Sequence, residues 1–373
     1  MSAPAATLAP LRDSIFGHPS IDCDVHPPAP AIGDLVPYFS DPYWREMVTL
    51  RGIDRLKLNP TSFPANAPIN CRPDWAMQAT SPAAQVAQMQ AQLLDPFGTS
   101  IAICNNLHGG QLLHAEDMAA AFCNALNSWM AREWLDRDPR LRASILVPVE
   151  NPQMAIEEIE RRADDQRFVS VQMFAMGEKL LGRRHYWPIY EVAQRLGLPI
   201  AVHAGSAFRF APTSIGWPSY FIEDYAANAP AFENQLLSLV AEGVFAKFPD
   251  LKVVFLESGW SWLPAFMWRA NKTWRGVRAE VPWVKKPPAE IMRQHVRIAV
   301  QPVDAPPKID MLEDIVQQIG DDGMLLFSTD WPHWHFDGTD ALPGPLAGDR
   351  ARRVLFENAL DTYPRIRRSL DRG

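Results

Sequence analysis

Eight short apolar runs, separated by longer amphipathic stretches, constrain the fold of this 373-residue chain more than any other feature of its sequence. From residue 99 almost to the end, β-like runs alternate with segments whose apolar residues recur at three- and four-residue spacing. This alternation indicates parallel strands connected by helices. The runs are SIDCDVH (20–26), SIAIC (100–104), RASILVPV (142–149), FVSVQMF (168–174), PIAVHAG (199–205), KVVFLESG (252–259), HVRIAVQPV (295–303) and GMLLFSTD (323–330). The simplest architecture is therefore an α/β fold of the (β/α)8, or TIM barrel, type.

A doubly wound sheet is the rival architecture, but it would need a glycine-rich phosphate loop. Neither G-x-G-x-x-G nor G-x-x-x-x-G-K-[ST] occurs in the chain. We expect a single barrel domain over residues 1–373. Residues 27–80, rich in proline, asparagine and aromatic residues, are predicted to form an insertion after the first strand that covers the C-terminal mouth of the barrel.

Charge and targeting signals narrow the class of protein. The chain has 36 Lys and Arg against 43 Asp and Glu, and its only dense basic run is RIRRSL near the C-terminus, so we expect no nucleic-acid partner. Neither a signal peptide nor eighteen consecutive apolar residues are present, which predicts a cytoplasmic protein without membrane contact. Four widely spaced cysteines without C-x-x-C argue against disulfides and a thiolate zinc site.

The first apolar run carries three polar side chains at alternate positions. Side chains alternate along a strand, so Asp22, Asp24 and His26 share one face, which we expect to be the barrel interior. Asp24 and His26 stand near the C-terminal end of the strand, where both can bind one cation. Asp22 lies deeper and is expected to act as a structural hydrogen-bond partner.

Three other runs end in groups of the same kind: His203 in AVHAG, Glu257 in FLESG and Asp330 in FSTDWPH. A lone D-x-H is weak evidence, because a satisfied core histidine is commoner than a ligand. Four polar strand ends directed at one mouth favour a metal site over that structural interpretation. Imidazole with carboxylate suits one divalent ion, Zn or Mn, with Fe(II) as a further alternative.

Four motifs resemble the amidohydrolase superfamily, and within it the amidohydrolase-2 group that includes aminocarboxymuconate semialdehyde, resorcylate and carboxyvanillate decarboxylases. They are IDCDVH, HAG, PDLKVVFLESG and STDWPH, and the similarity extends from about residue 20 to 370. The resemblance implies a homo-oligomer, specifically a dimer. It also assigns a role to four residues. The implied metal ligands are Asp24, His26, His203 and Asp330, with Asp330 also exchanging a proton with bound water.

The chain departs from the group's pattern at two positions. Asp24 stands where many relatives have histidine, which makes the ligand set harder and favours Mn over Zn. Glu257 stands where the group usually has a catalytic histidine, so either a carboxylate transfers the proton there or the proton transfer is relocated to another group. The fourth run, FVSVQMF, lacks the lysine that bridges two metals in binuclear members, so we expect a mononuclear site.

Several residues near these strand ends have both a functional and a structural interpretation. His333 either transfers protons or walls the substrate pocket, or it belongs to an aromatic loop packed on the barrel rim. For its neighbour His335 the packing role is favoured. Trp260 and Trp262 are candidates for stacking on a planar substrate, although tryptophan also commonly packs at rims. His108, in NNLHGG, is a third substrate-binding candidate.

The resulting functional prediction is an enzyme that acts on a small planar or carboxylated compound. Hydrolysis of a C–N or C–O bond by metal-activated water is slightly favoured, because the group's best-known decarboxylases retain the histidine that Glu257 replaces. The alternative is non-oxidative decarboxylation of an aromatic or semialdehyde acid by a carboxy-lyase. From a different class, a barrel that binds a ligand without turnover is the third hypothesis.

Overall fold

The computed structural model describes residues 11–50, 52, 71–205, 210–308 and 310–371. One eight-stranded sheet forms the centre of the molecule, and each strand lies parallel to the next in the order β1 to β8. The strands are β1 Ile21–Val25, β2 Ile101–Cys104, β3 Leu141–Leu146, β4 Phe168–Phe174, β5 Ile200–His203, β6 Val253–Leu256, β7 Val296–Ala299 and β8 Leu325–Leu326. The predicted (β/α)8 barrel is therefore confirmed.

Backbone hydrogen bonds connect the first strand to the chain that follows the last one. Cys23 N–H donates to the carbonyl of Phe327 at 3.0 Å, and Asp330 N–H donates to the carbonyl of Asp24 at 2.9 Å. His26 N–H donates to the carbonyl of Trp331 at 2.7 Å. These bonds bring the ends of β1 and β8 together, and with them the aspartates that the sequence placed at two distant strand ends.

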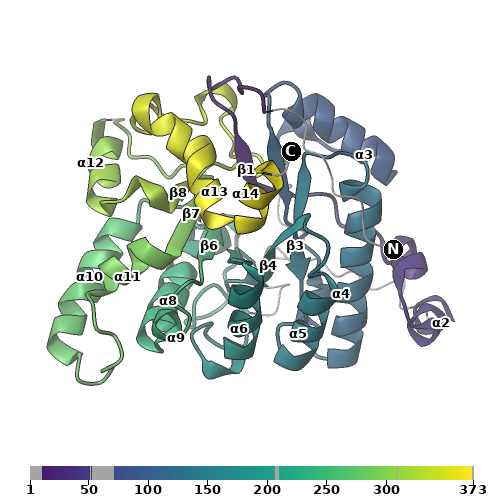
Figure 1. Cartoon of the computed structure of the whole chain (residues 1–373), viewed down its shortest axis with the longest axis horizontal. Helices are drawn as coiled ribbons and strands as arrows, with labels where there is room; N and C mark the ends of the chain where they lie inside the picture. Colours follow the sequence, from purple (N-terminus) through teal and green to yellow (C-terminus); the bar gives the residue numbers. More distant parts are fainter. Residues whose placement is uncertain (1–10, 51, 53–70, 206–209, 309, 372–373) are drawn as a thin grey trace.

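Helices lie outside the strands and cover their outer faces (Figure 1). Those described are α1 Ile32–Leu35, α2 Pro42–Leu50, α3 Pro82–Met89, α4 Glu116–Met130, α5 Pro152–Arg161, α6 Trp187–Leu196, α7 Phe221–Ala226, α8 Asn228–Ala241, α9 Val244–Lys247, α10 Leu263–Val277, α11 Pro288–His295, α12 Asp310–Ile319, α13 Asn358–Thr362 and α14 Pro364–Asp371. In none of them is an apolar stretch long enough to cross a bilayer.

Local sequence signals explain where several helices begin and end. Helix α5 starts at a proline, and the side chain of Asn151 accepts a hydrogen bond from the Met154 N–H, which caps its first turn. Helix α6 ends at Gly197, whose φ of 67° is readily adopted only by glycine. These caps satisfy backbone groups at the two helix ends and so help to set where each helix begins or ends.

The predicted insertion at residues 27–80 lies only partly within the described residues, because positions 51 and 53–70 fall outside them. Its described part contains α1 and α2, followed by residues that contact the loop after β8. Arg72 N–H donates to the carbonyl of Pro332 at 2.9 Å, and the Arg72 guanidinium donates to the carbonyl of Phe336 at 3.0 Å. The end of the segment therefore borders the barrel mouth, whereas the predicted cover over the mouth stays a prediction.

Candidate metal centre

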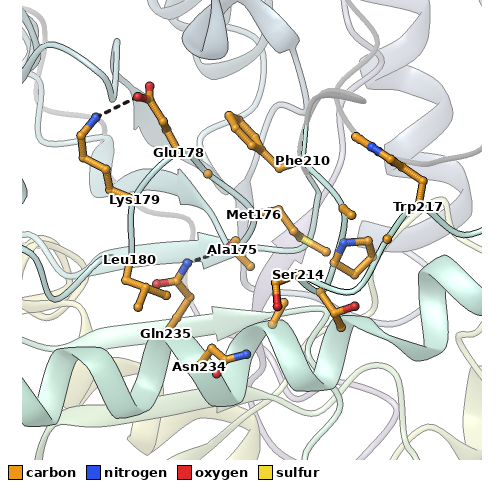
Figure 2. Close-up of a pocket in the computed structure, with 16 residues that line it drawn as sticks. Ala175, Met176, Glu178, Lys179, Leu180, Phe210, Ser214, Trp217, Asn234 and Gln235 are labelled. Carbon is orange, nitrogen blue, oxygen red and sulfur yellow. Dashed lines mark hydrogen bonds and ion pairs between the residues drawn. The ribbon is translucent and has the colours of Figure 1, made fainter.

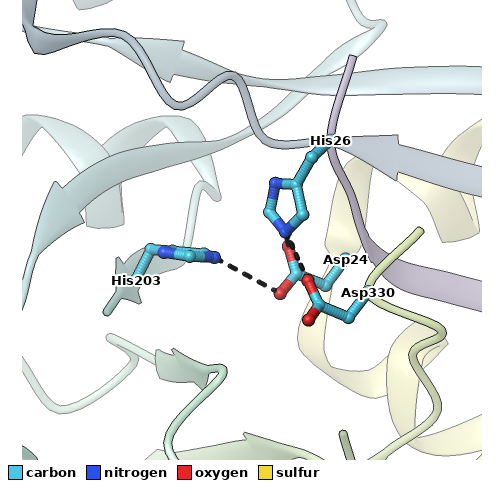
Figure 3. A group of neighbouring side chains, drawn as sticks. All are labelled: Asp24, His26, His203 and Asp330. Atoms are coloured by element: carbon cyan, nitrogen blue, oxygen red, sulfur yellow. Dashed lines mark ion pairs between the residues drawn. The ribbon is translucent and has the colours of Figure 1, made fainter. Parts of the chain in front are cut away.

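Asp24, His26, His203 and Asp330 converge at the carboxyl ends of three strands (Figure 3). One ligand atom from each lies within 4.8 Å of the others, and all four residues are buried. The His26 Nε2 atom is 3.3 Å from Asp24 Oδ1 and 2.7 Å from Asp330 Oδ1, and His203 Nε2 is 3.7 Å from Asp24 Oδ2. The structure thus brings together the four residues that the sequence and the family resemblance nominated as ligands.

Backbone carbonyls fix the tautomer of both histidines. His26 Nδ1 donates to the carbonyl of Asn105 at 2.8 Å, and His203 Nδ1 donates to the carbonyl of Ala204 at 2.6 Å. A carbonyl only accepts, so the proton must sit on Nδ1 of each ring. This arrangement orients Nε2 of each ring toward the cluster, as is usual for histidines that bind metals.

The cluster contains donor atoms that the protein itself leaves without partners. Asp24 Oδ2, His26 Nε2 and His203 Nε2 are buried and make no hydrogen bond. Among the described residues, no lysine or arginine forms an ion pair with Asp24 or Asp330. Because buried charges and unpaired polar atoms are costly, the donor set fits one divalent ion, as predicted.

The pKa shifts of His26 and Asp330 also indicate that a positive charge belongs at the centre of the cluster. Burial opposes protonation of His26, but the carboxylates of Asp24 and Asp330 outweigh it and raise the His26 pKa well above its ordinary value. Burial also opposes ionisation of Asp330, but His333 and His335 outweigh it and hold the Asp330 pKa well below its ordinary value. The ionised Asp330 carboxylate therefore faces a centre where a bound cation would balance its charge.

The loop after β8 holds Asp330 from its other side. His333 Nδ1 donates to Asp330 Oδ1 at 2.8 Å, and His335 Nε2 donates to Asp330 Oδ2. The packing role favoured for His335 from the sequence is thus replaced by direct contact with the cluster. The reason is local: the turn after β8 directs both histidines back toward the aspartate.

Glu257 approaches the cluster from β6. Its Oε2 atom lies 3.4 Å from His203 Nε2, and its Oε1 atom accepts a hydrogen bond from the Tyr225 hydroxyl at 3.1 Å. The same hydroxyl is 3.2 Å from His335 Nε2. Glu257, Asp330, His333 and His335 form a second group of ligand-type atoms within 4.8 Å of one another, so the two groups share Asp330.

Glu257 and Asp330 have an uncommon backbone conformation. Their φ angles are 56° and 58°, and they are the two non-glycine residues with positive φ in the described part of the chain. Such conformations cost on the order of 1 kcal/mol or more each and concentrate at functional sites. Strain at the two strand-end carboxylates agrees with a functional role for both.

Two contacts were missed by sequence reasoning. Asn105 donates from Nδ2 to Asp24 Oδ1 at 2.8 Å, while its backbone carbonyl holds His26, so it orients both β1 residues. Asn105 directly follows β2, and the rule applied to the other strand ends would have found it. Tyr225 lies in α7, and no spacing in the sequence links it to Glu257.

The positions of the three predicted substrate-binding residues favour packing over contact with a substrate. Trp260 is completely buried, and the Trp262 indole N–H donates to the carbonyls of Ser258 and Gly259. His108 is 2% exposed and accepts a hydrogen bond from the Gly110 N–H. These contacts favour packing roles, most of all for the fully buried Trp260, and substrate contact by the three residues stays a prediction.

A cavity of about 620 Å³ lies between the segment after β4 and the segment that precedes α7 (Figure 2). Met176, Phe210 and Trp217 contribute apolar surface, and Lys179 is paired with Glu150 at 3.3 Å. None of the predicted site residues lines this cavity. It is therefore separate from the metal centre.

Curated relatives with similar sequences are decarboxylases. The chain is 24% identical over 286 residues to a gamma-resorcylate decarboxylase from Polaromonas sp. (strain JS666 / ATCC BAA-500), an alignment that covers 71% of this chain and 82% of that protein. It is also 24% identical to a gamma-resorcylate decarboxylase from Rhizobium sp. (strain MTP-10005), with 68% and 78% covered.

Solved structures confirm the fold. An amidohydrolase from Mycobacterium avium subsp. paratuberculosis K-10 superposes with a TM-score of 0.67 at 19% identity, covering 92% of this chain and 98% of that one. A dihydroxybenzoic acid decarboxylase from Polaromonas sp. JS666, solved with bound manganese and the inhibitor 2-nitroresorcinol, gives a TM-score of 0.64 at 19% identity, with 93% and 97% covered.

The family assignment rests on a match that extends through the whole barrel. The amidohydrolase family model matches residues 21–365, from the start of β1 into α14. The match includes all four residues of the metal cluster and the loop after β8. It confirms the resemblance seen in the sequence motifs, and with it the prediction of an enzyme of hydrolase or carboxy-lyase type. The chain therefore belongs to the amidohydrolase family.

Proposed function

We propose that this protein catalyses the metal-dependent, non-oxidative decarboxylation of a small planar carboxylic acid. The buried cluster of two aspartates and two histidines with unpartnered donor atoms carries the proposal. The decarboxylase activity named for the curated relatives supports this chemistry over hydrolysis, which the sequence alone had slightly favoured. An aromatic acid is the substrate class that these relatives suggest.

The residues of the cluster have separable tasks in this reaction. Asp24, His26, His203 and Asp330 would hold a divalent ion, which would supply Lewis-acid stabilisation of negative charge on the substrate. Asn105 orients the β1 ligands, and burial of the cluster excludes water from the reacting carbon.

Proton delivery is the step that we assign to Glu257. Cleavage of the bond between the ring and the carboxylate releases carbon dioxide and leaves the electron pair on the ring carbon, which must then take up one proton. The Glu257 carboxyl lies at the edge of the cluster and also lines a cavity open to solvent. It can therefore donate a proton inward and recover one from the cavity, while the Tyr225 hydroxyl holds its Oε1 atom.

Hydrolysis of a C–N or C–O bond remains a second candidate because of one observation, the hydrogen bonds that His333 and His335 donate to Asp330. They keep Asp330 ionised, so it can accept a proton from an attacking water, with Glu257 protonating the leaving group. A barrel that binds ligand without turnover is the third hypothesis.

One experiment separates the three hypotheses. Manganese-loaded protein is incubated in D2O with hydroxybenzoic acids, lactones and cyclic amides, and products are identified by mass spectrometry and NMR. Decarboxylation yields carbon dioxide and one deuterium at the former carboxyl-bearing carbon, and His26→Ala should abolish it. Conversion of a lactone or amide while every acid stays intact would establish hydrolysis, and binding of an acid without any conversion would favour the non-catalytic barrel.

A further inference from the structure

A second cavity, of about 870 Å³, adjoins the metal centre. Glu257 and His335 lie among its lining residues, and aromatic rings contributed by α7 and by the loop after β8 form part of its wall. The ring centroids of Phe221 and Tyr225 are 5.5 Å apart, and those of Tyr225 and Trp334 are 6.5 Å apart. A planar substrate can pack against these rings while its reacting end remains at the metal.

The polar groups of this cavity are mostly hydrogen-bond acceptors. Besides Glu257 they include the carboxylates of Asp304 and Asp337, both on exposed residues, and no lysine or arginine belongs to the described lining. The one basic side chain in that lining is His335, which is paired with Asp330. The potential inside the cavity is therefore negative, and it repels a second anionic group on a substrate.

Asn228 gives an independent indication that a donor belongs in this cavity. Asn228 is one of the lining residues and is 6% exposed, and its buried Oδ1 atom makes no hydrogen bond. A buried amide oxygen without a partner is costly, and an N–H group of a ligand would satisfy it.

The position of the Asp304 carboxylate depends on Gly259, which lies two residues after Glu257. Gly259 has a φ of 61°, and a Cβ atom built on it would lie 1.8 Å from Asp304 Oδ2. The Asp304 carboxylate thus rests directly on the backbone two residues after Glu257. A side chain at position 259 would displace this carboxylate, so glycine lets it lie against the backbone at this wall.

We propose that this cavity receives the end of the substrate remote from the metal and selects an N–H donor there. The substrate class is an aromatic or cyclic acid with an amino or aminoalkyl substituent, and compounds with a second carboxylate at that end are rejected. The inference rests on the proposed function only in placing the substrate's reacting carboxylate at the metal. Asp304 and Asp337 are the specificity-determining residues.

The test measures binding rather than turnover. Three 2-hydroxybenzoates that differ only at position 4, with an aminomethyl, an amino or a carboxylate group, are titrated calorimetrically into manganese-loaded protein. The aminomethyl compound tests a cation and the amino compound a neutral donor. We expect the aminomethyl compound to bind at least about tenfold more tightly than the dicarboxylate, with the amino compound between them. Raising the salt concentration should reduce this preference, because both aspartates are exposed.

Variants assign the preference to the two aspartates. Asp304→Asn and Asp337→Asn should each lower it by about threefold, and the double variant should remove most of it. Asp340→Asn is the matched control, because Asp340 is exposed nearby but does not line the cavity.

The outcomes separate this inference from the proposed function. A preference for the aminomethyl compound that the double variant loses supports the inference even if no compound is decarboxylated, a result that would count against the proposed function alone. Equal binding of the dicarboxylate, or a preference that survives the double variant, overturns the inference even if all three acids are decarboxylated.

Discussion

Replacing Glu257 by glutamine tests the proton-transfer role directly. The amide has the same shape as the carboxyl group and can still accept the Tyr225 hydrogen bond of 3.1 Å, so packing should be preserved. It cannot donate a proton to carbon as a carboxylic acid does. General acid catalysis contributes about a hundred- to ten-thousandfold, so we expect kcat to fall by roughly two to four orders of magnitude.

The metal content of Glu257→Gln distinguishes a proton-transfer role of Glu257 from a role as a metal ligand. Glu257 Oε2 is 3.4 Å from His203 Nε2, close enough that a ligand role has to be tested. We expect the variant to retain about one manganese per chain by elemental analysis, because Asp24, His26, His203 and Asp330 remain. Loss of the metal would instead identify Glu257 as a ligand, and a wild-type rate with the metal retained would show it to be structural.

Two further variants control the measurement. Glu280→Gln makes the same chemical change at an exposed position and should leave rate and metal content unchanged. Tyr225→Phe removes the hydroxyl that donates to Glu257 but leaves the carboxyl group intact. One such hydrogen bond contributes about 0.5–1.5 kcal/mol, so the rate should fall by roughly two- to tenfold, clearly less than in Glu257→Gln. An equal loss in both variants would contradict direct proton donation by Glu257.

Three other outcomes are expected. Protein purified without chelators should contain about one divalent metal per chain; absence of metal together with activity insensitive to chelator would refute the metal centre. Asp330→Asn should keep the fold and lower activity at least about a hundredfold, whereas a near-wild-type rate would limit Asp330 to positioning. Burial lowers the His108 pKa from 6.5 to about 4. As pH falls, the unfolded chain therefore binds a proton before the folded chain does. The free energy of unfolding should fall by about 3 kcal/mol between these two pH values. In His108→Asn, the side chain can still accept from the Gly110 N–H. Its free energy of unfolding, measured in urea, should therefore no longer show this fall between pH 7 and pH 4.5. A pH dependence equal to that of the wild type would contradict the argument.

The sequence alone determined the barrel and the ends of its strands. Eight apolar runs separated by amphipathic segments fix the order of the elements, and parallel connections bring all carboxyl ends to one mouth. Asp24, His26 and His203 lie in a strand or directly after one, so their positions follow from strand periodicity and topology. Asp330 follows the end of β8 by four residues, and its φ of 58° shows that loop conformation also directs it. The family resemblance then supplied a role for each of them.

Tertiary structure decided the orientation of the groups beyond the strands. His203 is the register partner of Leu256, so strand alternation by itself would direct the following residue, Glu257, to the opposite face. The left-handed turn at Glu257 brings its carboxylate to the cluster instead. Trp260, three residues later, enters the core, although its sequence neighbourhood is equally consistent with a rim position.

The positions of loop residues around the site also could not be predicted from the sequence. Tyr225 and Asp304 come from two different connections, and each meets the site through a contact with another segment, Tyr225 with Glu257 and Asp304 with Gly259. Periodicity in a sequence reports which face of a regular element is buried. Loop conformation instead depends on packing against distant segments, such as the room that Gly259 leaves for Asp304, and that information exists only once the barrel has brought the loops together.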